Sequence, residues 1–182
     1  MSYLKLHLKA IRMYFALPDC EPYSSDYRSA SHPTQSAIAG LVGCAMGFAR
    51  NSAESIKLRD TLNVYYHTLK PGLCIYKEIQ TIRPLAIKTY AVHGKRGNNF
   101  ETVGNGVPTE ETNVCKTIDY LENAEFDVYI EGSEQELRQY HAALRNPRWI
   151  TYAGKANCWF DEPLVPKECI IEEELPSCMQ PC

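Results

Sequence analysis

The middle of the chain holds the residues whose types and spacing best suit a chemical role. Three permanent cations and one titratable ring fall within nine residues, on a glycine-punctuated stretch free of acidic groups: Lys88, His93, Lys95 and Arg96. Two aromatic residues, Tyr90 and Phe100, accompany them. Cations contact phosphates and aromatic rings stack on bases, so this pattern indicates a surface that follows a nucleic-acid backbone. An ordinary solvated loop is the alternative that charge alone leaves open.

Histidine and tyrosine are the residues of this chain that could act as catalytic bases. The five histidines stand outside motifs such as H-E-x-x-H, and no serine lies in G-x-S-x-G. A metal-independent ribonuclease needs a base close to a cation, and His93 beside Lys95 and Arg96 is the better candidate. Tyr66 and His67 are neighbours, but adjacent residues of a strand point to opposite faces. We therefore expect no catalytic residues, with a metal-independent endoribonuclease as the alternative.

Composition excludes several other classes of protein. The 182 residues are 45% hydrophobic and 23% charged, which describes a soluble globular chain. The formal net charge is -3, so a nucleic-acid partner must be argued from local patches. The eight cysteines include no C-x-x-C pair, so we expect no metal site and no cofactor. No stretch has the length of a membrane span and the N-terminus lacks signal-peptide anatomy, which predicts a cytoplasmic protein without a membrane partner.

Alternating hydrophobicity predicts the strands that must position these residues. The expected strands run over Tyr3–Ala10, Leu62–Thr68, Phe126–Ile130 and Trp149–Tyr152. In the first of them the face opposite the leucines is basic, with Lys5, His7 and Lys9. This basic face is either solvated or turned toward phosphates.

Helical spacing predicts the remaining elements. A first helix should begin at its N-cap Thr34 and continue to about Arg50, and a short second helix should cover Ser52–Leu58. Ser133 and Glu136 form a capping box that begins a further helix, which ends near Leu144. The stretch from Ile11 to Ser31 has no clear period and is expected to be a long loop.

The order of these elements predicts the fold class. Strand, helix, strand, insertion, strand, helix and strand follow one another, which is the α+β, ferredoxin-like βαββαβ arrangement with a hairpin-like insertion. The RNA-recognition motif has the same arrangement. The arrangement alone does not imply RNA, because this fold serves many functions.

Three segments in register resemble one family. Pro33–Ser36 with Ala39–Gly47 resembles the signature P-T-x-S-G-x-x-G-L-L-G-A-x-L-G, and Tyr66-His67-Thr68 resembles a D-Y-H-T strand. The stretch from Asp119 to Cys158 resembles Y-L-x-D-A-x-F, A-L-x-x-P-R and Y-x-G-R-x-S-C-P in turn. These are motifs of the CRISPR-associated Cas-five family. Over about residues 2–165 the chain is similar to the family's CasD subunit of type I-E Cascade.

The resemblance implies a domain organisation. Residues 1–182 would form a single ferredoxin-like domain, with a thumb-like β-hairpin excursion inserted at 71–118 and a short C-terminal extension at 159–182. The sequence ends at Cys182, short of the family's usual C-terminal portion, so whether the family's contacts to the large subunit are altered stays open at this point.

The resemblance also implies a function. It implies a non-catalytic Cascade subunit of the CasD type, which binds the 5′ handle of the CRISPR guide RNA and caps the backbone of the effector complex in antiviral defence. The implied partners are the guide RNA, a Cas-seven-type backbone subunit, the large Cascade subunit and, indirectly, target DNA. Relatives in type I-C systems cut precursor RNA themselves, so a Cas-five-type endoribonuclease that processes precursor guide RNA is the alternative. A free-standing RNA-recognition module unrelated to CRISPR is a third hypothesis.

The residues expected to contact RNA come from five parts of the chain. At the start of the first helix, free amides and the helix dipole favour a phosphate, although plain N-capping is an equal alternative for Thr34. The complete expected set is Arg28, Thr34, Gln35, Ser36, Tyr66, His67, Lys88, His93, Lys95, Arg96, Arg148, Tyr152, Lys155 and Asn157.

Overall fold

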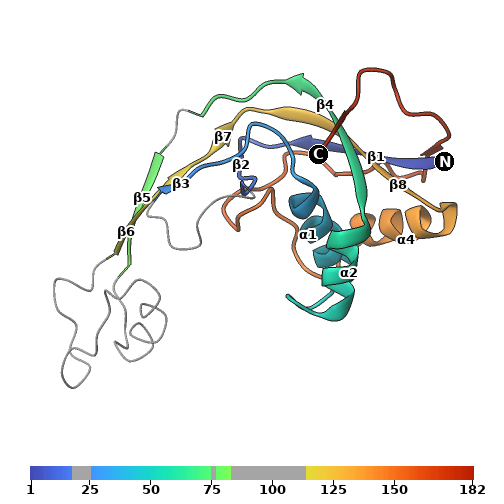
Figure 1. Cartoon of the computed structure of the whole chain (residues 1–182), viewed down its shortest axis with the longest axis horizontal. Helices are drawn as coiled ribbons and strands as arrows, with labels where there is room; N and C mark the ends of the chain where they lie inside the picture. Colours follow the sequence, from blue (N-terminus) through green and yellow to red (C-terminus); the bar gives the residue numbers. More distant parts are fainter. Residues whose placement is uncertain (18–25, 75–76, 83–113) are drawn as a thin grey trace. The chain divides into compact units, whose positions relative to one another are not determined.

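The computed structural model describes residues 1–17, 26–74, 77–82 and 114–182 (Figure 1). The chain divides into two compact units. The larger unit comprises Met1–Cys20, Arg28–Tyr76 and Asp119–Cys182, and the smaller unit comprises Glu21–Tyr27 and Lys77–Ile118. The predicted basic residues Lys88, His93, Lys95 and Arg96 lie outside the described residues.

The larger unit is built on a five-stranded antiparallel sheet. Its strand order is β10-β4-β8-β1-β9. The three long strands are β1 (Ser2–Lys9), β4 (Asn63–Lys70) and β8 (Glu125–Gly132), and β8 pairs with both others along its length. The two edges are the short strands β9 (Ile171–Glu172) and β10 (Gln180–Pro181). The predicted α+β class and the first three predicted strands are therefore confirmed.

The alternation in β1 determines which side of the sheet becomes the core. Leu4, Leu6 and Leu8 are 0–1% exposed and share one face, and each pairs with a buried residue of β8, such as Val128 opposite Leu6. Full burial of a leucine side chain contributes about 1.5–3 kcal/mol, so this row is a large part of the stability of the unit. A slip of one residue would turn the whole row outward, which holds β1 in its register.

Three helices lie together on one side of the sheet in Figure 1. They are α1 (Gln35–Met46), α2 (Ala53–Thr61) and α4 (Glu134–Arg145). The predicted N-cap Thr34 and the predicted capping box of Ser133 with Glu136 are both present. Helix α1 ends at Gly47, whose φ of 80° is in the left-handed region that glycine adopts readily. In the part of the chain that the structure describes, no helix is long and apolar enough to cross a membrane.

The predicted fourth strand, Trp149–Tyr152, is wrong. This run forms no strand, and Trp149 and Ile150 are 45% and 58% exposed. The edge beside β1 belongs instead to residues 161–172, where the Asp161 amide donates to the Lys9 carbonyl, the His7 amide donates to the Leu164 carbonyl, and β9 completes the pairing. Contacts with helix α4 hold this segment, because His141 Nε2 lies 2.9 Å from the Pro166 carbonyl oxygen.

The stretch expected to be a loop, Ile11–Ser31, contains two short strands. Strand β2 (Arg12–Met13) pairs with β7 (Leu121–Glu122) in antiparallel fashion within the larger unit. Strand β3 (Asp26–Tyr27) belongs to the smaller unit, where it runs parallel to β6 (Val114–Asp119). Strand β5 (Lys77–Ile82) lies on the other side of β6 in this three-stranded sheet. Two-residue strands are too short for a period to be visible in the sequence, which is why these were missed.

Candidate functional site

A groove of about 360 Å³ opens in the larger unit. Three segments that are far apart in the sequence form its walls: the residues after β2, the first turns of α1, and the loop that follows α4. The residues that line the groove include Tyr14, Ser36, Gly40, Leu41, Tyr152 and Gly154. Two of the residues predicted to bind RNA, Ser36 and Tyr152, therefore meet in one site.

The loop 153–158 is fixed by backbone hydrogen bonds. The Ala153 amide donates to the Cys158 carbonyl and the Cys158 amide donates to the Lys155 carbonyl, each at 2.9 Å. The Tyr14 amide donates to the Ala153 carbonyl at 2.9 Å, which joins the loop to the segment after β2. Gly154 has a φ of 97°, and a Cβ there would lie 1.7 Å from the Tyr14 carbonyl oxygen. A glycine is thus required for the loop to approach so closely.

The loop and the two aromatic residues that flank it make contacts beside the groove. Lys155 Nζ lies 4.6 Å from the centre of the Tyr14 ring, within the range of a cation–π interaction. Tyr152 and Trp159 meet edge to face, with ring centres 5.0 Å apart and ring planes at 73°. Asn157 Nδ2 donates to the Tyr120 hydroxyl at 3.0 Å, so this predicted RNA-binding residue also supports the fold.

The three predicted residues at the start of α1 have different environments. Thr34 is 8% exposed and its hydroxyl caps the helix by accepting from the Ala37 amide. The Gln35 side-chain amide donates to the Arg59 carbonyl at 3.1 Å, which ties α1 to the end of α2. Ser36 is exposed and lines the groove. Of the three, Ser36 is the one placed to meet a ligand beside the amides of the helix start.

Tyr66 and His67 lie on opposite faces of β4, as the sequence predicts. The Tyr66 hydroxyl donates to Gln180 Oε1 at 2.8 Å, and its ring stacks on His32 with ring centres 4.9 Å apart. Burial raises the pKa of Tyr66, which keeps its hydroxyl protonated near neutral pH. His67 is partly exposed on the other face. The two side chains therefore do not converge on one phosphate.

Two of the three predicted arginines, Arg28 and Arg148, lie outside the groove lining, and the third, Arg96, is outside the described residues. Arg28 is exposed after β3. Arg148 is also exposed, its backbone amide donates to the Ala45 carbonyl at 2.9 Å, and its side chain packs over Gly47. Both remain predictions as RNA contacts.

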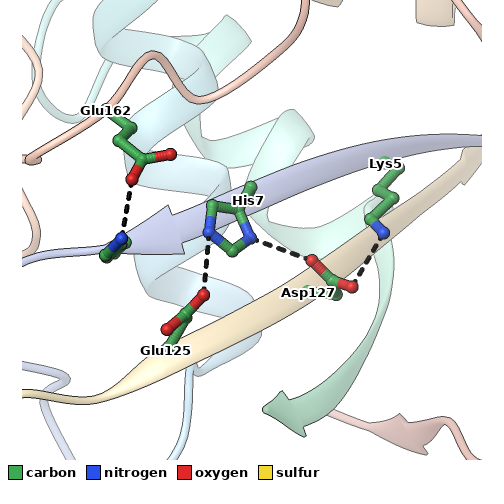
Figure 2. A network of polar contacts seen from close by, with 6 residues as sticks. Lys5, His7, Glu125, Asp127 and Glu162 are labelled. Carbon is green, nitrogen blue, oxygen red and sulfur yellow. Dashed lines mark hydrogen bonds and ion pairs between the residues drawn. The ribbon is translucent and has the colours of Figure 1, made fainter. Parts of the chain in front are cut away.

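A second hollow, of about 540 Å³, lies where β1 meets residues 162–172. Two of the basic residues that line it, Lys5 and His7, contact carboxylates, as does the nearby Lys9 (Figure 2). Lys5 Nζ lies 2.8 Å from Asp127 Oδ2, and His7 Nδ1 lies 3.0 Å from Asp127 Oδ1. Lys9 Nζ lies 2.7 Å from Glu162 Oε1. The basic face of the first strand is thus largely neutralised within the chain.

The electrostatics of Asp127 follow from this network. Its burial would raise the pKa of the carboxyl, but hydrogen bonds and charge from Lys5 and His7 outweigh burial, so the pKa is lowered. A phosphate at this face would have to displace a carboxylate from its cations. The groove at Ser36 is the better candidate for an anionic ligand. None of the described residues that line it carries a charge, and the cation Lys155 comes directly after Gly154 of its lining.

Sequence reasoning missed Tyr14 and Trp159. Trp159 is 58% exposed and contacts Tyr152, whereas Tyr14 is 8% exposed and forms both a wall of the groove and the partner of Lys155. The signal for Trp159 in the sequence was its position two residues after Asn157, a residue already predicted to bind RNA. No group of three His, Cys, Asp or Glu side chains within the described ranges could hold a metal ion.

Comparison with known proteins identifies the family. The family model described as "CRISPR-associated protein (Cas_Cas5)" matches residues 20–177, which is most of the chain. The chain therefore belongs to this family, the Cas-five family of CRISPR-associated proteins. No curated protein sequence matches the chain.

Two solved structures share the fold. A chain described as "CRISPR RNA-guided surveillance complex" has a TM-score of 0.63 at 17% identity, with 97% of this chain and 61% of that chain covered. Another, "Crystal structure of Cas protein", has a TM-score of 0.61 at 18% identity, with 95% of this chain and 67% of that chain covered. At these identities the likeness shows the fold alone, and this chain spans about three fifths of the length of the first structure.

Proposed function

We propose that this chain is a non-catalytic subunit of a Cascade-type CRISPR effector complex, that it binds the 5′ handle of the guide RNA, and that it caps the backbone of the complex in antiviral defence. The observation that carries the proposal is the groove that brings the start of α1 together with the loop containing Tyr152 and Lys155. Family membership and the fold of a chain named "CRISPR RNA-guided surveillance complex" support the setting.

The groove offers the groups that a sugar-phosphate chain requires. The first amides of α1 lack partners within the helix, and the helix dipole favours an anion there. Ser36 adds a hydroxyl at that point, and Lys155 adds a cation on the facing loop. A phosphate bound at Ser36 would place neighbouring nucleotides along the aromatic side chains of the groove.

A ferredoxin-like body is part of the proposal. Without β10, the sheet order is β4-β8-β1-β9, in which β8 lies between β1 and β4. Helices α1 and α2 connect β1 to β4, and α4 connects β8 to β9. This order and these connections support the split βαβ arrangement. The excursion between β4 and β8 would then be the thumb, with Lys88, His93, Lys95 and Arg96 near the guide.

The partners belong to the same proposal. They are the guide RNA, a Cas-seven-type backbone subunit, the large subunit and, indirectly, target DNA, in a cytoplasmic complex of the type I-E kind with a CasD-like subunit. The placement of Tyr66 and His67 on opposite faces of β4 supports a binding role over guide processing for this pair.

Two matched pairs of substitutions test the proposal. Ser36→Asp adds a carboxylate inside the groove, while Ser52→Asp adds one at the start of α2, outside the groove. Both carboxylates lie at a helix N-terminus, where the helix dipole favours a negative charge. Lys155→Glu reverses a charge beside the groove, and Lys57→Glu reverses an exposed charge on α2.

The measurement is binding of single-stranded RNA that carries the repeat-derived handle, as a function of salt. Ser36→Asp and Lys155→Glu should weaken binding, and the loss of the Lys155 contact should reduce the salt slope by roughly 0.7. The two control variants should bind as the unaltered protein does. Equal behaviour of all four variants would contradict the proposed site.

A further inference from the structure

An exposed pair of aromatic side chains, Tyr152 and Trp159, lies beside the groove. Trp159 is 58% exposed although it is a large apolar residue, and its partner Tyr152 is partly exposed and lines the groove. The rings contact each other edge to face at 5.0 Å, so each keeps a face that its partner does not cover. A single exposed apolar residue is common, but here two aromatic rings contact each other beside a groove, and such grouped exposed aromatic surface is typical of binding sites.

The groove next to this pair is a slot whose lining has the chemistry to take a flat ring. Small residues line it, among them Ala16, Ala37 and Gly40, and a Cβ at Gly40 would meet no atom within 4 Å. Tyr14 and Leu41 line it as well. None of the described lining residues is charged, and the volume of about 360 Å³ is at the small end of ligand pockets. A nucleobase has apolar faces, polar edges and no charge, so it suits this slot.

The positive charge of Lys155 beside the slot affects which flat ligands can bind there. Within the loop Gly154–Asn157 the charged residue is the cation Lys155. It lies over Tyr14, a wall of the slot. A base in the slot would therefore carry its own phosphate toward a cation, as single-stranded nucleic acids require. The loop is already fixed by its internal hydrogen bonds and by Gly154 against Tyr14, so binding would order little of the chain.

We propose that Trp159 and Tyr152 form a stacking platform for one unpaired base of single-stranded RNA, held at the mouth of the groove with its phosphate near Lys155. This inference rests on the proposed function and adds to it the part of the RNA that is recognised, which is the ring face of an unpaired base. The platform recognises a base by its ring face, so it favours unpaired bases over base-paired ones.

The test uses tryptophan fluorescence and affinity together. The sequence contains two tryptophans, so Trp149→Phe leaves Trp159 as the reporter. Stacking of a base should quench its emission when an oligouridine or oligoadenosine RNA is added. An abasic oligonucleotide of the same length, which keeps the phosphates and lacks the rings, should bind through charge and leave the emission unchanged.

Substitutions of Trp159 test how much the stacked base contributes to RNA affinity. Trp159→Leu should weaken binding of the oligonucleotides by about 5- to 150-fold, the range that corresponds to loss of one base–aromatic stack. Trp159→Phe should restore most of the affinity, because a phenyl ring still stacks. Trp149→Leu is the matched control, since Trp149 is 45% exposed and does not line the groove, and it should have no effect.

The outcomes separate the inference from the proposed function. If Trp159→Leu binds RNA normally while Lys155→Glu does not, the stacking platform is wrong and the phosphate site stands. If Trp159→Leu binds RNA normally but fails to assemble with protein subunits, the aromatic pair is a protein-docking surface, and the inference is overturned. If the unaltered protein binds none of these RNAs, both are wrong.

Discussion

Two glycines with positive φ allow a sharp prediction about the loop of the groove. Gly154 (φ 97°) and Gly47 (φ 80°) would both be strained by an added Cβ. At Gly154 the Cβ would lie 1.7 Å from the Tyr14 carbonyl oxygen, which is backbone. At Gly47 the nearest atom is Arg148 Cδ at 2.2 Å, which belongs to an exposed and flexible side chain. The same substitution thus meets a rigid obstacle in one place and a movable one in the other.

The expected magnitudes follow from these contacts. Gly47→Ala should cost about 1–2 kcal/mol, the ordinary penalty of the left-handed conformation, because Arg148 can rotate away. Gly154→Ala carries the same penalty, and the Tyr14 carbonyl must also withdraw by about 1.5 Å to reach a normal contact distance. That movement breaks the Tyr14–Ala153 hydrogen bond, worth about 1 kcal/mol, and disturbs Lys155 over the ring. We expect a total of about 3–4 kcal/mol.

The assay is urea unfolding of both full-length variants, followed by circular dichroism, with RNA affinity measured below the transition. Gly154→Ala should lower the midpoint about twice as much as Gly47→Ala and should weaken RNA binding even in the folded protein. Gly47→Ala is the control for stability alone, because its added Cβ displaces Arg148, which stays a predicted RNA contact. Equal destabilisation by the two substitutions would refute the reasoning, since it would mean that the loop moves away from Tyr14 at little cost.

Three further predictions concern stability and reactivity. Because the folded pKa of Asp127 is lowered, its contribution is present above the unfolded carboxyl value and is lost as pH falls through the folded one. Asp127→Asn should therefore cost about 1–3 kcal/mol at neutral pH, and this cost should shrink as the pH of the urea titrations falls below the unfolded carboxyl value; an unchanged cost over this pH range would contradict this. Burial raises the pKa of Cys182 to about 12, so at a mildly alkaline pH iodoacetamide should modify exposed Cys178 well before Cys182 in a mass-spectrometric time course, and equal rates would argue against that burial. Thr34→Ala should cost about 1 kcal/mol through loss of the α1 cap while Thr34→Ser costs little, and a tolerated alanine would show that the cap is dispensable.

Elements determined by neighbouring residues were predictable from the sequence. The capping box of Ser133 with Glu136, the N-cap Thr34 and the alternation of β1 each involve residues within one turn or one strand, and the structure has all three. The fourth strand was not predictable in this way. Trp149–Tyr152 has a strand-like composition, but pairing with β1 is decided by distant contacts of residues 161–172, including His141 with Pro166.

The candidate site was predictable in its parts and not in its assembly. Ser36, Tyr152 and Lys155 were named from helix-start chemistry and from motifs, and the structure places Ser36 and Tyr152 in one groove with Lys155 beside it. Tyr14 became visible as a wall only in three dimensions, because its position depends on the close approach of Gly154. The pairing of Lys5 and His7 with Asp127 depends in the same way on the register between β1 and β8.

The position of β9 and β10 has a consequence for synthesis of the protein. Residues 171–172 pair with β1 at one edge of the sheet, and residues 180–181 pair with β4 at the other. Both segments leave the ribosome after β1, β4 and β8 have been made, so a nascent chain can assemble its three long strands while their outer edges still lack partners. Unpaired edges of this kind invite pairing with other chains. Slow translation or a stalled ribosome near residue 170 should therefore promote aggregation more than a pause before β8.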